Sequence, residues 1–372
     1  METLIPAPVA TSSAAGLALA LADASRRRRS VTLDSRWIRP SSFTTLAVNV
    51  THVIVDAADL VATVGAGVTL ERLRLELANH EAFAAIDCPD ENLTVGEVLG
   101  LGYDGPLSHS YGRLKDQVLG LTFVTGHGKA ITAGGRVMKN VAGFDLPRLM
   151  IGAYGALGFI TEVHLRLRRM VERDVTWIAQ GTWERMTAMA DRLASTSPSA
   201  GQNPAHDLSA AEIVRRKSGV TLAIRFRGSA PGADELDRHV EQFGFRRNSD
   251  AWLRLDEQVA TASVVLRIGS TPSLARPVVA AVENRLGGDG VFRVNAVSGM
   301  LWAGECDAIA VKSLRQRLGE LEVPITIQRA PPELLASVSI FGPALTTASV
   351  VSRLRNAFDP AGILATGERL YG

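Results

Sequence analysis

The residues best suited by type and spacing to bind a ligand lie in a glycine-rich stretch, residues 134–169. Glycine is needed where the backbone takes a positive φ angle or where another group packs directly on the main chain. Backbone N–H groups exposed at such turns can bind an anionic or amide-rich ligand. A helix–turn–strand packing corner without any ligand explains the same spacing equally well. The glycines fall at bends between short apolar runs and are Gly134, Gly135, Gly143, Gly152, Gly155 and Gly158.

Other candidates for catalysis are few. The second half of the chain contains only two histidines, His206 and His239, which are far apart in sequence. Isolated histidines are usually surface or capping residues, so neither is expected to be a catalytic base. Cys88 and Cys306 are also far apart, and no cysteine or histidine spacing indicates a zinc or iron–sulfur site. No Ser, His and Asp arrangement and no P-loop stands out.

Length and composition describe a globular protein with room for two domains. The chain has 372 residues, of which 46% are hydrophobic and 21% are charged, and its net charge is +2. Two hydrophobic cores can form at this length, and the net charge argues neither for nor against nucleic acid as a ligand. Two distant cysteines indicate no disulfide framework and suit a reducing compartment, so we expect a cytoplasmic protein.

An apolar run near the N-terminus, residues 14–24, is followed by four arginines, Arg26 to Arg29. A secretory signal carries its positive charge before the apolar run, so the order here is reversed. The run is also too short to span a bilayer. We therefore expect an amphipathic helix there and no transmembrane segment in the chain.

The hydrophobic pattern predicts the elements that hold the glycine-rich stretch in place. Residues 145–152 predict a short helix, and residues 159–169 predict a strand in which Val163, Leu165 and Leu167 alternate with polar residues. From residue 171 onwards, strands and helices alternate in two rounds. This alternation predicts an antiparallel sheet with helices on one face, which would form a second domain.

The chain also contains four motifs in a characteristic order: residues 59–78 (DLVATVGAGVTLERLRLELA), residues 94–129 (from TVG to KDQVLGLTFVTGHGK), residues 139–163 (KNVAGFDLPRLMIGAYGALGFITEV) and residues 358–372 (FDPAGILATGERLYG). Together they resemble flavoproteins of the vanillyl-alcohol-oxidase/PCMH type, and within them the FAD-binding E subunits of bacterial glycolate oxidases. The motifs occur at that family's spacing and cover nearly the whole chain.

The resemblance implies an α+β fold in three parts. A PCMH-type FAD-binding domain is expected in residues 1–170, and a second α+β (ferredoxin-like) cap domain in residues 171–345. The C-terminal tail, residues 346–372, is expected to return to the first domain, where Phe358, Ile363 and Leu364 would pack.

The resemblance also implies a non-covalent FAD site, because no Cys or His lies in residues 31–40, where the family carries its covalent attachment histidine. Asp116 matches an arginine–aspartate pair of the family, with Lys115 in place of the arginine. No catalytic residue and no metal ligand is implied. The implied FAD-binding residues are Pro89, Thr94, Val95, Gly96, Asp116, Gly143, Gly155, Gly158 and Ile160.

Two departures from the family predict weakened FAD binding. The family wraps the FAD pyrophosphate with a glycine-rich loop, whereas this chain has no glycine between Leu17 and Val64. The family also carries a second glycine after the position of Gly96, where this chain has Glu97. A carboxylate beside a diphosphate repels it, and side chains keep backbone N–H groups from wrapping it closely.

These features favour an accessory subunit of a glycolate-oxidase-like 2-hydroxy-acid dehydrogenase complex, which does not turn over glycolate or lactate by itself. Its expected partners are a catalytic flavin subunit and an iron–sulfur subunit, and any association with a membrane is expected to occur through them. Two alternatives remain open: a stand-alone FAD-dependent oxidoreductase of a hydroxy acid or alcohol, and a degenerate flavoprotein that acts as a scaffold.

Overall fold

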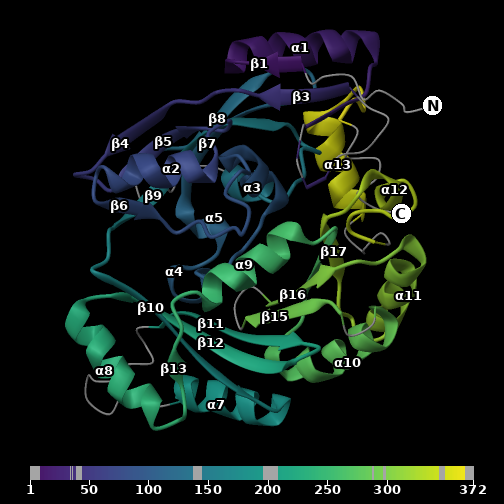
Figure 1. Cartoon of the computed structure of the whole chain (residues 1–372). Helices are drawn as coiled ribbons and strands as arrows, with labels where there is room; N and C mark the ends of the chain where they lie inside the picture. The colour runs from purple at the N-terminus through teal and green to yellow at the C-terminus, as the bar shows by residue number, and fades with distance from the viewer. Residues whose placement is uncertain are drawn as a thin grey trace.

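The computed structural model describes residues 9–33, 35, 37–38, 44–136, 145–195, 208–286, 289–295, 299–342 and 348–364. Three sheets and the helices around them make up this part of the chain (Figure 1). Among the described residues, no helix combines the length and the hydrophobicity that crossing a membrane requires.

The first sheet is small and parallel. Its strands β1 (Val9–Thr11) and β2 (Val31–Leu33) both pair with β3 (Thr44–Val48). Helix α1 (Ala14–Arg27) begins where the Ser13 hydroxyl accepts a hydrogen bond from the Gly16 N–H, and its apolar side packs on the sheet. The amphipathic helix expected from the apolar run is therefore present, although Leu19 is exposed while Leu17 and Leu21 are buried.

The second sheet is antiparallel and has the order β4–β5–β9–β7–β8, with β6 also paired to β9. Helices α2 (Leu70–Ala78) and α3 (Val95–Leu101) contribute their apolar side chains to the core that covers it. The predicted alternation in β9 is confirmed, because Val163, Leu165 and Leu167 are buried in that core. The strands are β4 (Val53–Asp56), β5 (Val61–Gly65), β6 (Ala82–Ala84), β7 (Val118–Val124), β8 (Ala130–Gly134) and β9 (Phe159–Arg169). Short helices α4 (Ser108–Tyr111), α5 (Leu114–Gln117) and α6 (Leu146–Met150) connect them.

The third sheet has eight antiparallel strands in the order β13–β10–β12–β11–β15–β16–β14–β17. Their bounds are β10 (Arg173–Gly181), β11 (Leu208–Arg216), β12 (Gly219–Gly228), β13 (Arg246–Arg247), β14 (Val264–Ile268), β15 (Val291–Asn295), β16 (Gly299–Gly304) and β17 (Ile325–Arg329). The helices of this part are α7 (Trp183–Ser195), α8 (Ala230–Glu241), α9 (Ala251–Thr261), α10 (Ala275–Leu286), α11 (Ala308–Gly319) and α12 (Pro332–Leu335), with a 3-10 turn η2 (Pro272–Leu274).

The expectation that helices cover only one face of this sheet is wrong. Trp177 and Ile178 are successive residues of β10. Helices α7 and α8 pack with Trp177, whereas α9 packs with Ile178. Because successive residues of a strand point to opposite faces, α9 covers the face that α7 and α8 leave open. Figure 1 shows α9 between the third sheet and the N-terminal elements.

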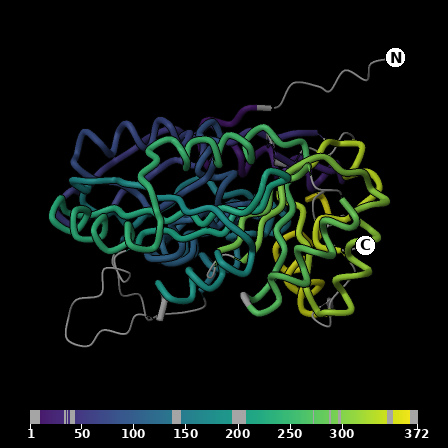
Figure 2. Tube along the Cα trace, turned by 60° about the horizontal axis from the view of Figure 1, so that its bottom comes forward, coloured from purple at the N-terminus to yellow at the C-terminus, as the bar shows by residue number. Residues whose placement is uncertain are grey.

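The C-terminal segment that the structure describes, residues 348–364, returns to the first sheet, as the sequence predicts. Helix α13 (Ala348–Phe358) places the Phe358 ring 5.9 Å from that of Phe123. Beyond it, Ile363 and Leu364 are buried beside α1, and Leu364 forms a parallel bridge with Val31 of β2. Figure 2 shows the C-terminal segment (yellow) at one end of the molecule.

Candidate functional site

A cavity lies between the parallel sheet and helix α3, and we call it the α3 cavity. Its lining includes side chains with hydroxyl groups and the surface of the helix at Gly100. A Cβ added to Gly100 would meet no atom within 4 Å, so the space beside it is open. The lining residues are Thr32, Ser35, Ile38, Glu97, Gly100, Leu101 and Tyr154.

The N-terminus of α3 has no free backbone donor in its first turn. The Glu97 carboxylate accepts a hydrogen bond from the Thr94 N–H at 2.8 Å, and the Thr94 hydroxyl accepts one from the Glu97 N–H at 3.2 Å. The N–H groups of Val95 and Gly96 donate at 2.8 Å to the carbonyl groups of Val68 and Ala66, which lie in the turn between β5 and α2. The predicted ligands Thr94, Val95 and Gly96 therefore lie together, but their N–H groups already have acceptors within the chain.

The predicted glycines have packing reasons to be glycine. A Cβ on Gly96 would lie 2.9 Å from the Cβ of Ala66, and a Cβ on Gly158 would lie 2.4 Å from the Val124 carbonyl oxygen. Gly158 also has a φ of +142°, a conformation that residues with a Cβ rarely adopt. Both positions thus hold segments of backbone close together, as the packing-corner interpretation requires.

The other predicted positions in this stretch differ in what they contact. Gly155 takes a φ of +77° at the turn before β9. Ile160 is buried in the sheet core, where it pairs with Phe123 of β7. Gly143 lies outside the described residues.

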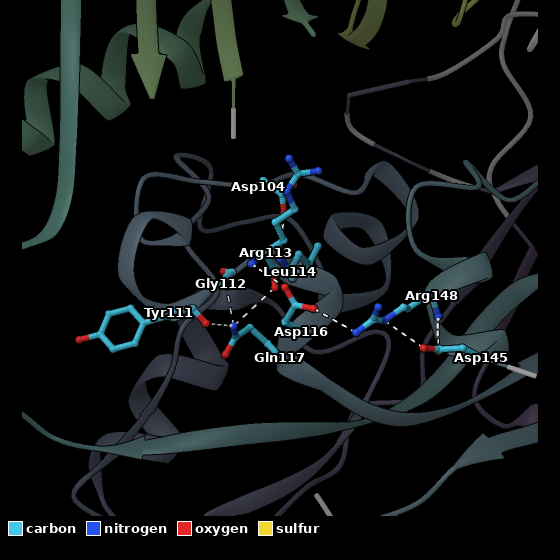
Figure 3. Close-up of polar contacts among 9 residues, drawn as sticks. All are labelled: Asp104, Tyr111, Gly112, Arg113, Leu114, Asp116, Gln117, Asp145 and Arg148. Carbon is cyan, nitrogen blue, oxygen red and sulfur yellow. Dashed lines mark hydrogen bonds and ion pairs between the residues drawn. The ribbon is translucent and has the colours of Figure 1, made fainter. Parts of the chain in front are cut away.

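Asp116 forms an ion pair with Arg148 (Figure 3). Its carboxylate accepts hydrogen bonds from the Arg113 N–H at 3.1 Å and from Arg148 Nη2 at 3.3 Å. Arg148, from α6, also pairs with Asp145 at 3.0 Å. Adjacent residues on a short helix point in different directions, and Arg148 reaches the carboxylate from another helix.

Pro89 lies in the segment that leads from β6 to α3 and is half-buried. The neighbouring Asp90 carboxylate accepts a hydrogen bond from Trp37 Nε1 at 3.1 Å, which holds this segment against the Trp37 ring. The other neighbour, Cys88, is buried, and burial raises the pKa of its thiol well above the usual value. The thiol therefore stays protonated and unreactive at neutral pH.

A second cavity lies where the segment after α3 meets the eight-stranded sheet, and we call it the cap cavity. No sequence motif pointed to it, because its residues come from the α3–α4 connection and from five different strands. The lining residues are Tyr103, Asp104, Pro106, Glu212, Arg267, Arg293, Gly299, Met300, Leu301 and Gln328. Tertiary structure alone brings these side chains together.

Arg293 is the most deeply buried charge in this cavity. Its side chain is 3% exposed, and it donates from Nε to Glu212 at 2.6 Å and from Nη1 to Asp256 at 2.7 Å. Although burial opposes its charge, the two carboxylates raise the pKa of Arg293 well above the usual value. Burial in turn raises the pKa of the Glu212 carboxyl, against the opposing effect of Arg293.

A second arginine lies nearer to solvent. Arg267 Nη2 is 3.4 Å from an oxygen of Asp104, and Arg267 Nη1 donates to the Gly102 carbonyl at 3.3 Å. The other oxygen of Asp104 accepts a hydrogen bond from the Leu114 N–H at 2.8 Å. Asp104 therefore joins the α5 region drawn in Figure 3 to strand β14 of the eight-stranded sheet.

The two cavities are linked by one hydrogen-bonded pair of side chains. Gln328, which lines the cap cavity, donates from Nε2 to the Tyr154 hydroxyl at 2.9 Å and to the Leu101 carbonyl at 3.3 Å. Tyr154 and Leu101 line the α3 cavity, and the Tyr154 hydroxyl donates to the Ile327 carbonyl at 3.2 Å. A ligand that filled both cavities would therefore pass this pair.

Among the described lining residues of the two cavities, none is a histidine. His239 lies on α8 and His206 lies outside the described residues. Within the part of the chain that the structure describes, no group of three or more His, Cys, Asp or Glu side chains could hold a metal ion.

Comparison with known proteins identifies the N-terminal region. Residues 9–134 match the family described as "FAD binding domain". The glycolate oxidase subunit GlcE of Escherichia coli (strain K12) is 39% identical over 135 residues, which cover 35% of this chain and 38% of that protein. The D-lactate dehydrogenase of Archaeoglobus fulgidus is 35% identical over 129 residues, 35% of this chain and 29% of that protein. The glycolate oxidase subunit GlcD of Bacillus subtilis (strain 168) is 33% identical over 126 residues, 34% of this chain and 27% of that protein. Each match thus spans well under half of the relative.

Solved structures share the fold over most of the chain. Two structures of alkyldihydroxyacetonephosphate synthase superpose with TM-scores of 0.66 and 0.67 and cover 96% of this chain, at 12% and 13% identity. The superpositions span 76% and 75% of those chains. At such low identity they establish the fold and nothing about the reaction.

Proposed function

Because residues 9–134 form a FAD-binding domain of the PCMH type related to glycolate oxidase subunits, we propose that this chain is the FAD-binding accessory subunit of a glycolate-oxidase-like 2-hydroxy-acid dehydrogenase complex. The relatives with similar sequence include glycolate oxidase subunits and D-lactate dehydrogenases, so the chain belongs with FAD-linked oxidoreductases of hydroxy acids. We propose in addition that the chain has an accessory role and that its binding of FAD is weakened.

The observation that carries the accessory role is the first turn of α3. All four of its N–H groups, from Thr94 to Glu97, have acceptors within the chain, so none is left to bind a diphosphate. The Glu97 carboxylate, which lines the α3 cavity, adds a like charge. Among the described lining residues of this cavity, none is Lys or Arg. These residues fit a diphosphate poorly, which supports weak binding.

Other parts of the two cavities fit FAD better. The open surface at Gly100 can accept a flat group along α3, and Thr32 and Ser35, which carry hydroxyl groups, line the same cavity. The cap cavity contains two arginines and a glutamine close to the pair that joins both cavities. FAD would lie across both cavities, with its flavin toward the cap cavity.

In this proposal FAD is bound non-covalently and, when bound, supplies redox chemistry that protein side chains lack. The residues implied by the family resemblance mainly hold segments of the protein around the site in place. Gly96 and Gly158 keep α3 and β9 close to their neighbours, and Asp116 with Arg148 holds α5 against α6. Residues 1–170 bind the nucleotide, residues 171–345 cover it, and residues 346–372 close the first domain.

The proposed partners are a catalytic flavin subunit and an iron–sulfur subunit, in a cytoplasmic complex that reaches a membrane only through them. A stand-alone FAD-dependent oxidoreductase is the second candidate, favoured by the charged cap cavity. A scaffold without FAD is the third candidate, favoured by the occupied α3 amides.

One set of measurements separates the three candidates. The purified chain is supplemented with FAD, its visible spectrum is recorded, and turnover of glycolate and D-lactate is measured with an artificial acceptor, alone and with co-expressed partner subunits. We expect weak flavin binding, colour that acid precipitation removes from the protein, and turnover only with partners. Turnover by the chain alone at the rate of the complex would establish the stand-alone enzyme. An absence of flavin binding, alone and in the complex, would establish the scaffold.

A further inference from the structure

A third cavity lies between the segment that leads from β6 to α3 and the segment that leads from α3 to α5, and we call it the Asp87 cavity. It has room for one group of about the size of a water molecule. The polar side chains in its lining are those of Asp87, Tyr103, Asp104 and Ser108. All four carry oxygen, and none of the described lining residues carries a side-chain nitrogen. Oxygen atoms alone are the ligands that hard cations prefer.

The Asp87 carboxylate has no cationic partner among the described residues. Its Oδ2 accepts a hydrogen bond from the Leu107 N–H at 3.2 Å. Burial raises the pKa of this carboxyl, and Asp256 acts in the same direction, whereas Arg225 and Arg293 oppose the rise. The negative charge of Asp87 is therefore only partly compensated by its surroundings.

The arginines near Asp87 are already balanced by other carboxylates. Three arginines face three carboxylates, in the pairs Arg293 with Glu212 and Asp256, and Arg225 and Arg227 with Asp174. Asp104, which also lines the Asp87 cavity, pairs with Arg267 at 3.4 Å. Asp87 is left as one extra negative charge beside these pairs. A buried charge without a partner is costly, and one positive charge in the cavity would balance it.

Ser108 supplies a second oxygen that lacks a partner. The residue is 5% exposed, and its Oγ has no hydrogen-bond partner among the described residues. Ser108 directly follows Leu107, whose N–H binds Asp87 Oδ2, so the serine and the carboxylate lie in the same small region. A water molecule in the cavity would satisfy the hydroxyl and leave the charge unbalanced. A cation would satisfy both groups.

We propose that Asp87 and Ser108 bind one monovalent cation, K⁺ or Na⁺, in the Asp87 cavity. The Asp87 carboxylate supplies the balancing charge, and the Ser108 hydroxyl supplies a neutral oxygen. A divalent ion would leave an excess positive charge near Arg267 and Arg293, which repels it. This inference goes beyond the proposed function and does not depend on whether the chain binds FAD.

The ion would stabilise the segment on which the eight-stranded sheet rests. Ser110, two residues after Ser108, donates a hydrogen bond from its hydroxyl to the Ser209 carbonyl at 3.3 Å. Asp104, in the same segment, pairs with Arg267 of β14. A cation that joins Asp87 to Ser108 therefore holds in place the part of the first domain that contacts the second.

The test is urea unfolding of the full-length, flavin-free chain at increasing KCl or NaCl. Choline chloride keeps the ionic strength constant, and choline is too large for a cavity of this size. For one bound ion, the ratio of folded to unfolded chain rises about tenfold for each tenfold rise in ion concentration once the site is mostly occupied. We expect this dependence in KCl or NaCl, or in both, relative to choline chloride alone.

Two variants locate the ion. Asp87→Asn keeps an oxygen that can accept the Leu107 hydrogen bond and removes the charge, so the dependence on K⁺ or Na⁺ should disappear. Ser108→Ala should raise the concentration for half-saturation about tenfold, because one ligand is lost. If no ion bound there, removal of an unpaired buried hydroxyl would leave the cation dependence unchanged.

The matched control is Ser110→Ala, in the same short helix α4, where the hydroxyl is already bonded to the Ser209 carbonyl. It should lower stability by the same factor in every salt and keep the wild-type dependence on K⁺ or Na⁺. If Asp87→Asn fails to fold, the comparison of Ser108→Ala with Ser110→Ala decides the test.

Three outcomes would overturn the inference. Equal wild-type stability in KCl, NaCl and choline chloride means that no cation binds and that water fills the cavity. A cation dependence that Asp87→Asn and Ser108→Ala both retain places the ion elsewhere. Stabilisation by Mg²⁺ or Ca²⁺ at lower concentrations than by K⁺ or Na⁺, abolished by Asp87→Asn, makes the site divalent. Because no flavin is added, each outcome leaves the proposed function unaffected.

Discussion

Replacement of Glu97 separates its structural role from its effect on FAD. The side chain is 7% exposed, and its carboxylate both caps α3 through the Thr94 N–H and lines the α3 cavity. Glu97→Gln keeps an oxygen that can accept the Thr94 hydrogen bond and removes the charge. Glu97→Gly, which restores the glycine typical of the family, removes both the charge and the cap.

The two substitutions should change stability by different amounts. The reciprocal hydrogen bonds between Thr94 and Glu97 form a capping box, and loss of a capping side chain costs about 1 kcal/mol. We therefore expect Glu97→Gly to lower the free energy of unfolding by about 1 kcal/mol. Glu97→Gln should lower it less, because the amide oxygen retains the hydrogen bond to the Thr94 N–H.

Both substitutions should strengthen FAD binding. Two like unit charges about 8 Å apart repel by about 0.5–2 kcal/mol at an effective dielectric constant of about 80 to 20. Removing that repulsion corresponds to an affinity gain of about twofold to thirtyfold. The gain should shrink at high ionic strength, because salt screens the interaction.

The assays are urea unfolding of the flavin-free chain and FAD titration at low and high salt. The control is Glu71→Gln, at an exposed acidic residue in the first turn of α2, which should leave FAD affinity unchanged. If Glu97→Gln binds FAD no better than the wild type, the carboxylate does not oppose FAD and the argument for weakened binding loses its main support.

Three further predictions concern the scaffold. Gly158→Val should destabilise the fold by about 3 kcal/mol or more, because a Cβ there meets the Val124 carbonyl. The control is Gly219→Val, at a similar φ of +136° with open space around it. In urea unfolding of both variants, Gly219→Val should lower the free energy of unfolding by less. Asp359→Ala should cost about 3 kcal/mol, because the buried carboxylate accepts hydrogen bonds from two tail N–H groups at 3.0 and 2.7 Å; an unchanged melting temperature would contradict this. Burial lowers the pKa of His164 below its usual value of 6.5. As the pH falls below 6.5, the unfolded chain therefore takes up a proton before the folded chain does, and the free energy of unfolding of the wild type should fall until the pH passes the folded-state pKa. His164→Gln should lose less stability over the same pH range, because it lacks the titrating group.

Local pattern was sufficient to predict the elements around the glycine-rich stretch. The alternation in residues 159–169 predicted β9, and Thr69 begins α2 through its side chain, which accepts a hydrogen bond from the Arg72 N–H. Family motifs predicted the FAD-binding fold and the return of the tail to the first sheet, where Ile363 and Leu364 are buried. The local elements depend on hydrophobic period and on short-range capping, and both can be read along the chain; the fold and the course of the tail were expected only from the family resemblance.

The sequence did not distinguish a glycine that a ligand approaches from a glycine that backbone approaches. Gly96 and Gly158 were expected to contact FAD, and the structure places neighbouring backbone against both. Asp116 was implied as an FAD-binding residue, and in the structure Arg148 reaches its carboxylate from thirty-two positions further along the chain. In each case the competing partner is distant in sequence and cannot be inferred from spacing.

By itself, the sequence determined the fold class, the FAD-binding family of residues 9–134 and the course of the tail. Only the tertiary structure decided that the α3 amides are occupied and that Arg293 and Gln328 line one cavity. The first set of features follows from hydrophobic periodicity and from short motifs that resemble a known family. The second set depends on the turn between β5 and α2, which approaches α3, and on β15 and β17, which lie in one sheet with β16 and β14 between them. These segments are far apart in sequence, and only folding brings them together.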